Sequence, residues 1–186
     1  MSVREKGFTL IELLITLAVL AILLLVAVPN FGSFIADSRI SAAKDKLVSS
    51  ISLARSESIK RGERVVICRK SSGANTCAAT SQSGTQDWSD GWLVYLDEDE
   101  NLAIDTNGLI RVYGDIDDSV TVQYTRGDVV IFSSLGLLDT SSTTDETFSI
   151  SDSGDSNAGA GLSVRPTGRI RMCANWTASS ATCADN

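Results

Sequence analysis

The chain has 186 residues, 43% of them hydrophobic, with 16 Lys and Arg against 23 Asp and Glu and a formal net charge of −7. This length suits one domain with an appendage, and the apolar content is sufficient for a core. Because the sequence lacks histidine, it excludes Ser-His-Asp and Cys-His nucleophiles and every His-ligated zinc site.

The charge is unevenly distributed along the chain. Residues 37–70 carry nine Lys and Arg against four acids, residues 71–161 carry two Arg against sixteen acids, and residues 162–186 carry three Arg against one Asp. The overall acidity argues against a protein that binds nucleic acid over its whole surface. A local basic face remains compatible with this distribution, because contacts depend on charges within about 8–10 Å.

An apolar segment of 21 residues, from Phe8 to Val28, follows a hydrophilic start that contains Arg4 and Lys6. As a helix this segment is about 30 Å long, which matches the hydrocarbon core of a membrane. A cleaved secretory signal and an uncleaved anchor both fit, although no small-x-small cleavage site follows. Glu12 lies inside the segment, where an ionisable group is costly and usually functional.

The helical pattern continues beyond the apolar segment. Pro29 and Gly32 are expected to kink or locally melt the helix. Apolar residues then recur at helical spacing over 37–61, and Gly62 is expected to end the helix. We predict one helix over 8–61, whose second half packs on a sheet. The basic residues of that half are expected to form a solvated face: Lys44, Lys46, Arg55, Lys60 and Arg61.

After Gly62 the pattern changes to short β-rich runs bounded by Gly, Asp, Asn or Ser. Residues 71–87 and 139–161 are rich in Ser, Thr, Gly and Asp and are interpreted as loops, the second around one strand. The predicted fold class is α+β, with one long N-terminal helix, its first half transmembrane, packed on antiparallel β-sheet. The predicted strands are 64–70, 91–97, 109–113, 120–124, 129–132, 148–151, 162–165 and 169–173.

The acidic run 97–101 has carboxylates at the first, third and fifth positions of a calcium-type loop, and Asp105 follows. Leu102 stands at the sixth position, where such a loop needs Gly, and Gly108 stands at the twelfth, where it needs Glu. An acidic hairpin loop is therefore favoured, with a weak calcium site as the alternative. A hydrolytic carboxylate pair is disfavoured, because an exposed loop does not separate two pKa values. We expect no cofactor, no metal and no enzymatic activity.

The segment from Gly7 to Leu13 (G-F-T-L-I-E-L) resembles the prepilin signal of type IV pilins and type II secretion pseudopilins. The resemblance implies that a prepilin peptidase cuts between Gly7 and Phe8 and that the new N-terminus at Phe8 is methylated. It also implies that Glu12, the fifth mature residue, neutralises the N-terminal amine of a neighbouring subunit in a filament. Because an unpaired buried charge is costly, this pairing can set the axial register.

This resemblance divides the chain into a cleaved leader (1–7), a hydrophobic transmembrane and filament-core helix (8–36) and a periplasmic or extracellular head domain (37–186). The implied location is the bacterial inner membrane, with a single pass and a periplasmic head, followed by a tip-proximal place in a pilus or pseudopilus. The positive charges of the leader agree with its cytoplasmic position. The implied partners are the prepilin peptidase, the inner membrane, and other minor and major pilins or pseudopilins.

Four cysteines in an exported chain favour disulfides. Of three connectivities, we favour Cys68–Cys77 with Cys173–Cys183, because each bond closes a short loop of small polar residues. Zinc is the alternative, but eight and nine intervening residues do not match zinc-ligand spacing. The disulfides would fix loops that have few apolar residues of their own.

Two further motifs resemble the GspH/FimT/FimU group of minor pilins and pseudopilins. Residues 88–95 (W-S-D-G-W-L-V-Y) are similar to the W-x-x-G-W strand of this group, and residues 131–136 (I-F-S-S-L-G) resemble its F-x-x-x-G turn. Trp88 and Trp92 are interpreted as core residues, and Gly91 allows the strand to begin tightly.

The segment 165–173 (R-P-T-G-R-I-R-M-C) is the sharpest functional candidate. Residues two apart in a strand point the same way, so Arg169 and Arg171 share a face, and Gly168 permits a tight turn beside Arg165. Three guanidiniums on one patch can hold a phosphate backbone. The segment resembles the G-R-x-R motif of the FimT branch, which implies DNA contact through Gly168, Arg169 and Arg171, with Arg165 as a looser match.

Structural interpretations of this segment stay open. Arginine is common on exposed strand faces, and the acidic middle of the chain repels DNA unless it points away. Trp176 can add a stacking side chain or cover the strand. The leading function is a minor pilin that helps to initiate or cap a type IV pilus, with binding of double-stranded DNA for natural transformation as an added role. The alternative is a GspH-type pseudopilin of a type II secretion system that contacts cargo or tip subunits.

Overall fold

The computed structural model describes residues 7–114, 116–139, 145–155, 158–173 and 176, without the side chains of 24–30. Helix α1 (Leu10–Arg61) is 52 residues long and begins two residues after the predicted start. The Thr9 hydroxyl oxygen accepts from the Glu12 N–H at 3.3 Å and caps the N-terminus. Gly62 ends the helix as predicted, in the left-handed conformation with φ of 69°.

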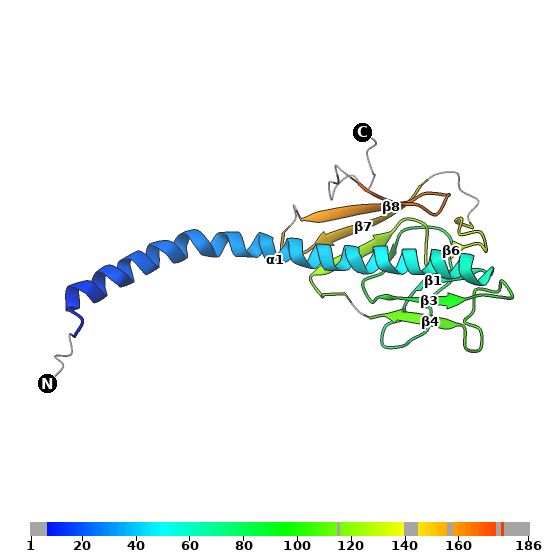
Figure 1. Cartoon of the computed structure of the whole chain (residues 1–186), viewed down its shortest axis with the longest axis horizontal. Helices are drawn as coiled ribbons and strands as arrows, with labels where there is room; N and C mark the ends of the chain where they lie inside the picture. Colours follow the sequence, from blue (N-terminus) through cyan, green and yellow to red (C-terminus); the bar gives the residue numbers. More distant parts are fainter. Residues whose placement is uncertain (1–6, 115, 140–144, 156–157, 174–175, 177–186) are drawn as a thin grey trace.

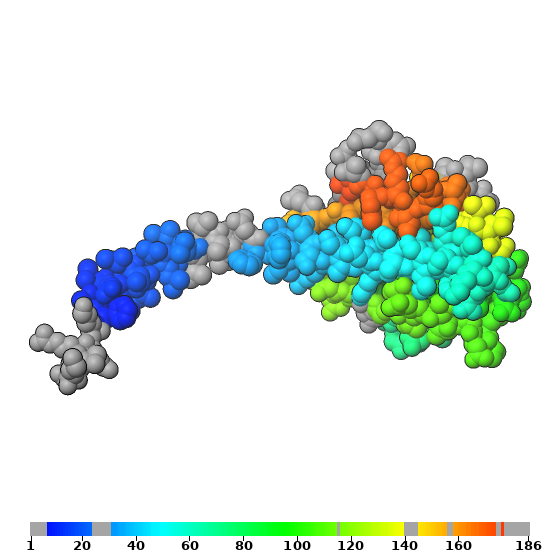
Figure 2. Space-filling view, viewed as in Figure 1, coloured from blue at the N-terminus to red at the C-terminus, as the bar shows by residue number. Residues whose placement is uncertain are grey.

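The N-terminal half of α1 extends away from the rest of the molecule, and the C-terminal half lies along the head (Figure 1). In the space-filling view the extension is a narrow rod beside a broad head (Figure 2). No helix in the described part of the chain is apolar enough over a sufficient length to cross a membrane. The membrane-spanning segment, which includes residues 24–30, stays a prediction.

The helix continues through Pro29 and Gly32, so the prediction of local melting there is wrong. A proline removes one backbone hydrogen bond, and a helix with many turns on both sides can absorb that loss by curving. Figure 1 shows a gently curved helix rather than two separate helices. The extended N-terminal half of α1 and the half that lies along the head therefore belong to one continuous helix.

Two antiparallel sheets follow the helix, where the sequence predicted antiparallel sheet without dividing it. The first sheet has the order β4-β3-β1-β6 and the second has the order β2-β5-β7-β8-β9. The first sheet consists of β1 (Val65–Arg69), β3 (Trp92–Leu96), β4 (Leu109–Tyr113) and β6 (Val129–Phe132). The second consists of β2 (Gln86–Asp87), β5 (Val120–Tyr124), β7 (Glu146–Asp152), β8 (Gly159–Val164) and β9 (Ile170–Met172).

Eight of these strands lie at predicted positions, and β2 lies inside a segment interpreted as a loop, so that part of the loop prediction is wrong. β2 has two residues and pairs with β5, with Gln86 opposite Tyr124 and Asp87 opposite Gln123. A polar pair of residues carries no alternating pattern, because its strand geometry comes from pairing with a partner distant in sequence.

The main core lies between α1 and both sheets. One stripe of α1 is almost fully buried against it, as the helical spacing of the sequence predicts. The residues of this stripe are Ala36, Ile40, Ala43, Leu47, Ile51 and Ala54. Trp88 and Trp92 are fully buried in the same core, which confirms their interpretation as packing residues. The Trp88 indole N–H donates to the Gly127 carbonyl oxygen at 3.1 Å, so its polar group is satisfied.

A second, smaller core lies on the other face of the first sheet, around Val66, Cys68 and Tyr95. The predicted Cys68–Cys77 disulfide is present and ties the loop after β1 to this face. Cys183 lies outside the described residues, so the Cys173–Cys183 bond stays a prediction.

Gly91 provides a test of backbone packing in the W-x-x-G-W strand. It has φ of 92°, and an added Cβ would collide with the Tyr113 carbonyl oxygen. Gly73 has φ of 72° but no atom near its Cβ position. We expect Gly91→Ala to lower the free energy of unfolding by about 3 kcal/mol or more, against about 1 kcal/mol for Gly73→Ala. Urea unfolding of the full chain in detergent, followed by tryptophan fluorescence, measures both values, and equal losses would contradict this packing.

Candidate functional site

The predicted processing site lies at the exposed start of α1. Phe8 is 85% exposed, and Glu12 is exposed in the first turn of the helix. The large apolar side chains from Leu10 to Leu23 are each more than half exposed. A single subunit therefore leaves this apolar surface uncovered, and covering it requires other molecules. The roles of Gly7, Phe8 and Glu12 stay predictions.

The segment with the candidate arginines forms a hairpin between β8 and β9. The Gly168 N–H donates to the Arg165 carbonyl oxygen at 2.7 Å, and the Arg165 N–H donates to the Arg169 carbonyl oxygen at 2.9 Å. Gly168 has φ of 73°, as the last residue of a three-residue hairpin loop requires. The expected turn at Gly168 thus places Arg165 and Arg169 opposite each other.

A second hairpin loop of the same construction follows β6, at the F-x-x-x-G motif. The Gly136 N–H donates to the Ser133 carbonyl oxygen at 2.8 Å, and the Ser133 N–H donates to the Leu137 carbonyl oxygen at 2.9 Å. Gly136 has φ of 71°, in the same left-handed region as Gly168. Both glycine motifs therefore end in a three-residue loop with glycine at its third position.

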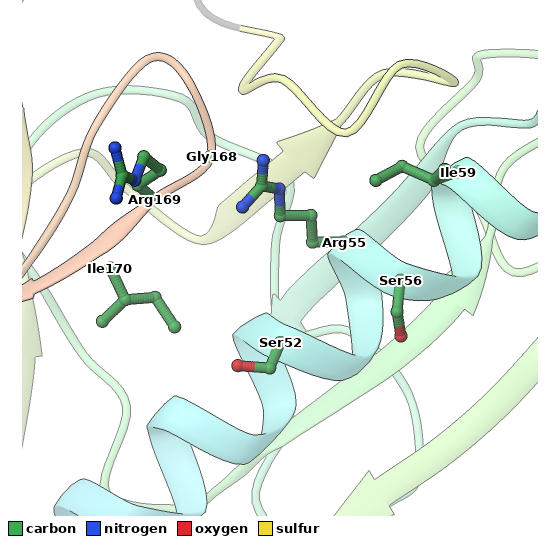
Figure 3. Close-up of a pocket in the computed structure, with 7 residues that line it drawn as sticks. All are labelled: Ser52, Arg55, Ser56, Ile59, Gly168, Arg169 and Ile170. Atoms are coloured by element: carbon green, nitrogen blue, oxygen red, sulfur yellow. The ribbon is translucent and has the colours of Figure 1, made fainter.

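These two loops pack directly against each other. An added Cβ at Gly168 would collide with the Gly136 carbonyl oxygen, and the Leu138 N–H donates to the Pro166 carbonyl oxygen at 3.0 Å. Arg55 joins the contact from α1, because its Nε donates to the Gly136 carbonyl oxygen at 3.1 Å. The close-up shows Arg55 beside Gly168 (Figure 3). Close packing thus explains Gly168 without a ligand.

Arg55 corrects the prediction of a wholly solvated basic face. It is half-buried, and its hydrogen bond reaches a residue 81 positions away in sequence. The sequence did contain one signal, since Arg55 follows the buried Ile51 by four residues and therefore lies on the same side of the helix. Lys60 and Arg61, in contrast, bind Glu57 on the helix surface.

The three candidate arginines have different environments. Arg165 Nε lies 3.7 Å from Asp145 Oδ2, and their side chains are 49% and 37% exposed. Arg171 is half-buried, stands opposite Ser163 in the sheet register and makes an interaction of its own. Arg169 is exposed and makes no ion pair with any described residue. The hairpin brings the three together, and Arg169 is the one of them that is both exposed and without an ion pair to a described residue.

A groove of about 450 Å³ lies between α1 and this hairpin (Figure 3). Arg55 and Arg169 give it two positive charges, and Ile59 and Ile170 give it apolar surface. No acidic residue belongs to the described lining. The lining residues are Ser52, Arg55, Ser56, Ile59, Gly168, Arg169 and Ile170. The arrangement suits an anionic group with an apolar neighbour, and the sequence did not predict it.

Trp176 packs on β8. An added Cβ at Gly161 would collide with the indole ring, and Gly159 also approaches the ring closely. The indole ring therefore packs against the backbone at these two glycines, where a larger residue would crowd it. Of the two interpretations of Trp176, the contact favours the one in which it covers the strand.

The acidic loop after β3 is organised around an arginine of the protein. Arg64 lies 3.1 Å from the buried Asp97 carboxylate, 3.6 Å from Glu100 and 3.7 Å from Asp139. Burial raises the pKa of the Asp97 carboxyl, while Arg64 and the Leu102 N–H act in the opposite direction. Among the described residues no group of three or more acidic or Cys side chains could hold a metal ion. The segment joins the paired strands β3 and β4 as a hairpin loop, and Arg64 is the partner of its carboxylates at Asp97 and Glu100.

Comparison with known protein families identifies the family of this chain. Residues 43–168 match the model of the family described as type II transport protein GspH, and residues 3–28 match that of the prokaryotic N-terminal methylation motif. The chain belongs to the GspH family. This membership confirms the resemblance to the GspH/FimT/FimU group, and it makes the protein a pilin-like or pseudopilin-like subunit.

Two individual proteins are similar to parts of this GspH-family chain. The type IV major pilin protein PilA of Myxococcus xanthus (strain DK1622) is 52% identical over 44 residues, which are 24% of this chain and 20% of PilA. The match thus spans about one fifth of that relative. The crystal structure of the type IV minor pilin FimU from Pseudomonas aeruginosa (strain PAO1) has a TM-score of 0.53 and 19% identity, over 73% of this chain and 88% of that chain. This likeness confirms the α+β pilin-like fold.

The hydrogen bond of Arg55 can be tested by mutation. Arg55→Met keeps an aliphatic stem but removes the donor to the Gly136 carbonyl, so we expect the free energy of unfolding to fall by about 1.5 kcal/mol. Lys60→Met removes an exposed charge of the same helix and should change it by less than about 0.5 kcal/mol. Urea unfolding of the full chain in detergent compares the two, and an Arg55→Met effect as small as that of Lys60→Met would mean that Arg55 is merely solvated.

Proposed function

We propose that this chain is a non-enzymatic minor-pilin subunit that helps to initiate or cap a type IV pilus filament. The observation that carries the proposal is the exposed apolar half of α1, which is continuous with a folded head and begins at a methylation motif. Such a helix suits the membrane before assembly and the core of a filament afterwards. A GspH-type pseudopilin of a type II secretion system is the alternative, since it requires the same helix.

The proposed maturation uses Gly7, Phe8 and Glu12. A prepilin peptidase at the inner membrane cuts between Gly7 and Phe8, and the new amine at Phe8 is methylated. The head is then periplasmic, and in the filament Glu12 of one subunit neutralises the amine of its neighbour. Because both groups are buried there, loss of either charge leaves the other without compensation.

Glu12→Gln tests this pairing. The variant keeps the shape of the side chain and should still lose its leader, because the Gly7–Phe8 bond is unchanged. An unpaired buried amine costs several kcal/mol, so we expect incorporation into sheared filaments to fall more than tenfold. Immunoblots of filament and membrane fractions, with N-terminal mass spectrometry, measure both steps. Asp37→Asn removes an exposed carboxylate from the same helix as a control, and normal incorporation of Glu12→Gln would refute the pairing.

DNA binding for natural transformation is a second candidate role, through phosphate contacts of the hairpin. The observation in its favour is that Arg165 and Arg169 stand opposite each other at an exposed hairpin end. Against it, Arg165 already faces Asp145, and packing accounts for Gly168. Double-stranded DNA is therefore a weaker partner candidate than another pilin.

A salt titration tests this role. If Arg169 contacts a phosphate, Arg169→Ala should weaken binding to labelled duplex DNA and reduce the salt slope by about 0.9. Arg111→Ala removes the same charge from β4, where Arg111 stacks on Tyr113 at 5.2 Å, and should have a smaller effect. Fluorescence anisotropy of the full chain in detergent at several salt concentrations gives both slopes. Equal losses of DNA affinity in the two variants would contradict a localised phosphate site at Arg169. Absence of binding at low salt would contradict DNA binding by this chain.

A further inference from the structure

A second hollow of the head has the opposite charge to the groove at Arg169. This acidic pocket has a volume of about 260 Å³ and contains four exposed aspartates and no Lys or Arg in its described lining. Its residues are Asp87, Ser89, Asp90, Ile116, Asp117, Asp118, Val120 and Thr121. Acidic residues alone do not make a binding site. The position of this pocket relative to the basic groove is therefore needed as well.

The two hollows lie at different ends of the head. Arg39 of α1 lies beside the acidic pocket, because its Nε is 3.4 Å from Oδ2 of the lining residue Asp117. Arg55 of the same helix lines the basic groove. Sixteen residues separate these positions, which in an α-helix is about 24 Å along the axis and about 160° around it. The surfaces are thus displaced along the helix and lie on different sides of it.

One side of the acidic pocket is a hydrogen-bonded turn. The Val120 N–H donates to the Asp117 carbonyl oxygen at 2.8 Å, which closes a turn, and the Ser119 N–H donates to Asp117 Oδ1 at 3.0 Å. This backbone hydrogen bond holds the pKa of the Asp117 carboxyl below its usual range, so that carboxyl is charged at neutral pH. Asp118 lies exposed within this turn and makes no ion pair with any described residue.

We infer that the basic groove of one copy receives the Asp117–Ser119 turn of a second copy, with Asp118 facing Arg169. The described lining of the groove has two arginines and no acidic residue, and the turn presents carboxylates on a hydrogen-bonded backbone. Opposite charges on matching surfaces steer association and fix its register. The inference rests on the proposed function, because it assigns one contact between the heads of two filament subunits.

The contact has a definite symmetry. The groove and the turn are different surfaces, so each copy offers one to the copy on one side and the other to the copy on the opposite side. Such a heterologous contact does not close on itself as a two-fold dimer does, and it can repeat along an axis. The displacement of about 24 Å between the two surfaces along α1 is compatible with repetition of this kind.

A zero-length cross-link tests the contact without filament formation. Arg169→Lys keeps the charge and places a primary amine in the groove, which a carbodiimide can join to a neighbouring carboxylate as an amide with loss of water. Equal amounts of ¹⁴N- and ¹⁵N-labelled full chain, purified in detergent, separate intermolecular from intramolecular links by mass spectrometry. We expect mixed-isotope links from position 169 to Asp117 or Asp118, at least fivefold above those from Arg111→Lys.

Two further arms keep the test decisive. Adding Asp118→Asn to Arg169→Lys should reduce the links at least threefold, and raising the salt from 50 to 500 mM should also reduce them, because exposed charge pairs are screened. Links from position 169 only to carboxylates elsewhere, or no more links than from position 111, would overturn the contact. The Glu12→Gln incorporation assay is independent of this result, so failure of the contact and failure of the filament role are distinguishable.

Discussion

Burial of one face of α1 against both sheets is the constraint on which the rest of the head depends. The two sheets share no strand, and Leu47, Ile51 and Ala54 lie in the core between them and the helix. Burial of a Leu or Ile side chain such as Leu47 or Ile51 contributes about 1.5–3 kcal/mol, and burial of Ala54 contributes less. The helix therefore sets the relative position of the sheets, and through them the position of each loop. The groove beside Arg55 and the ion pair of Arg39 with Asp117 both depend on this placement.

The first half of the same helix exposes its apolar side chains to solvent, whereas the second half buries them on one face. From Leu10 to Leu23 its large apolar side chains are each more than half exposed, although they carry the same kind of surface that the head buries. Removal of such surface from water is strongly favourable, so this half of the helix drives association with a membrane or with other helices. One continuous helix thus joins a part that packs in the core of the head to a part whose apolar surface is exposed.

Sequence patterns predicted those features that depend on neighbours close in sequence. The strands 109–113, 120–124 and 129–132 have the predicted bounds, because each is a short β-rich run between turn residues. The end of α1 at Gly62 follows from its left-handed conformation. β2 was missed because its geometry comes from pairing with β5 rather than from its own two polar residues.

The candidate site was less predictable, because it forms between segments far apart in the chain. The turn at Gly168 and its arginines were predictable from residues 165–173, but the groove is also lined by residues of α1. Arg55 and Gly136 meet across 81 positions, and no periodicity of one segment contains that information. Likewise, alternation identifies a strand but not its neighbour, so the division into two sheets required the three-dimensional structure.

The paired hairpin loops have a consequence for how this surface can change among relatives. Backbone atoms of Gly136 and Gly168 make the contact between the loops, whereas the neighbouring Leu135 is 74% exposed and Thr167 is exposed. Substitutions at these exposed positions leave the contact and the core intact. Evolution can therefore alter this edge of the head at little cost to folding. Relatives that keep the same scaffold can thus present different side chains at this edge.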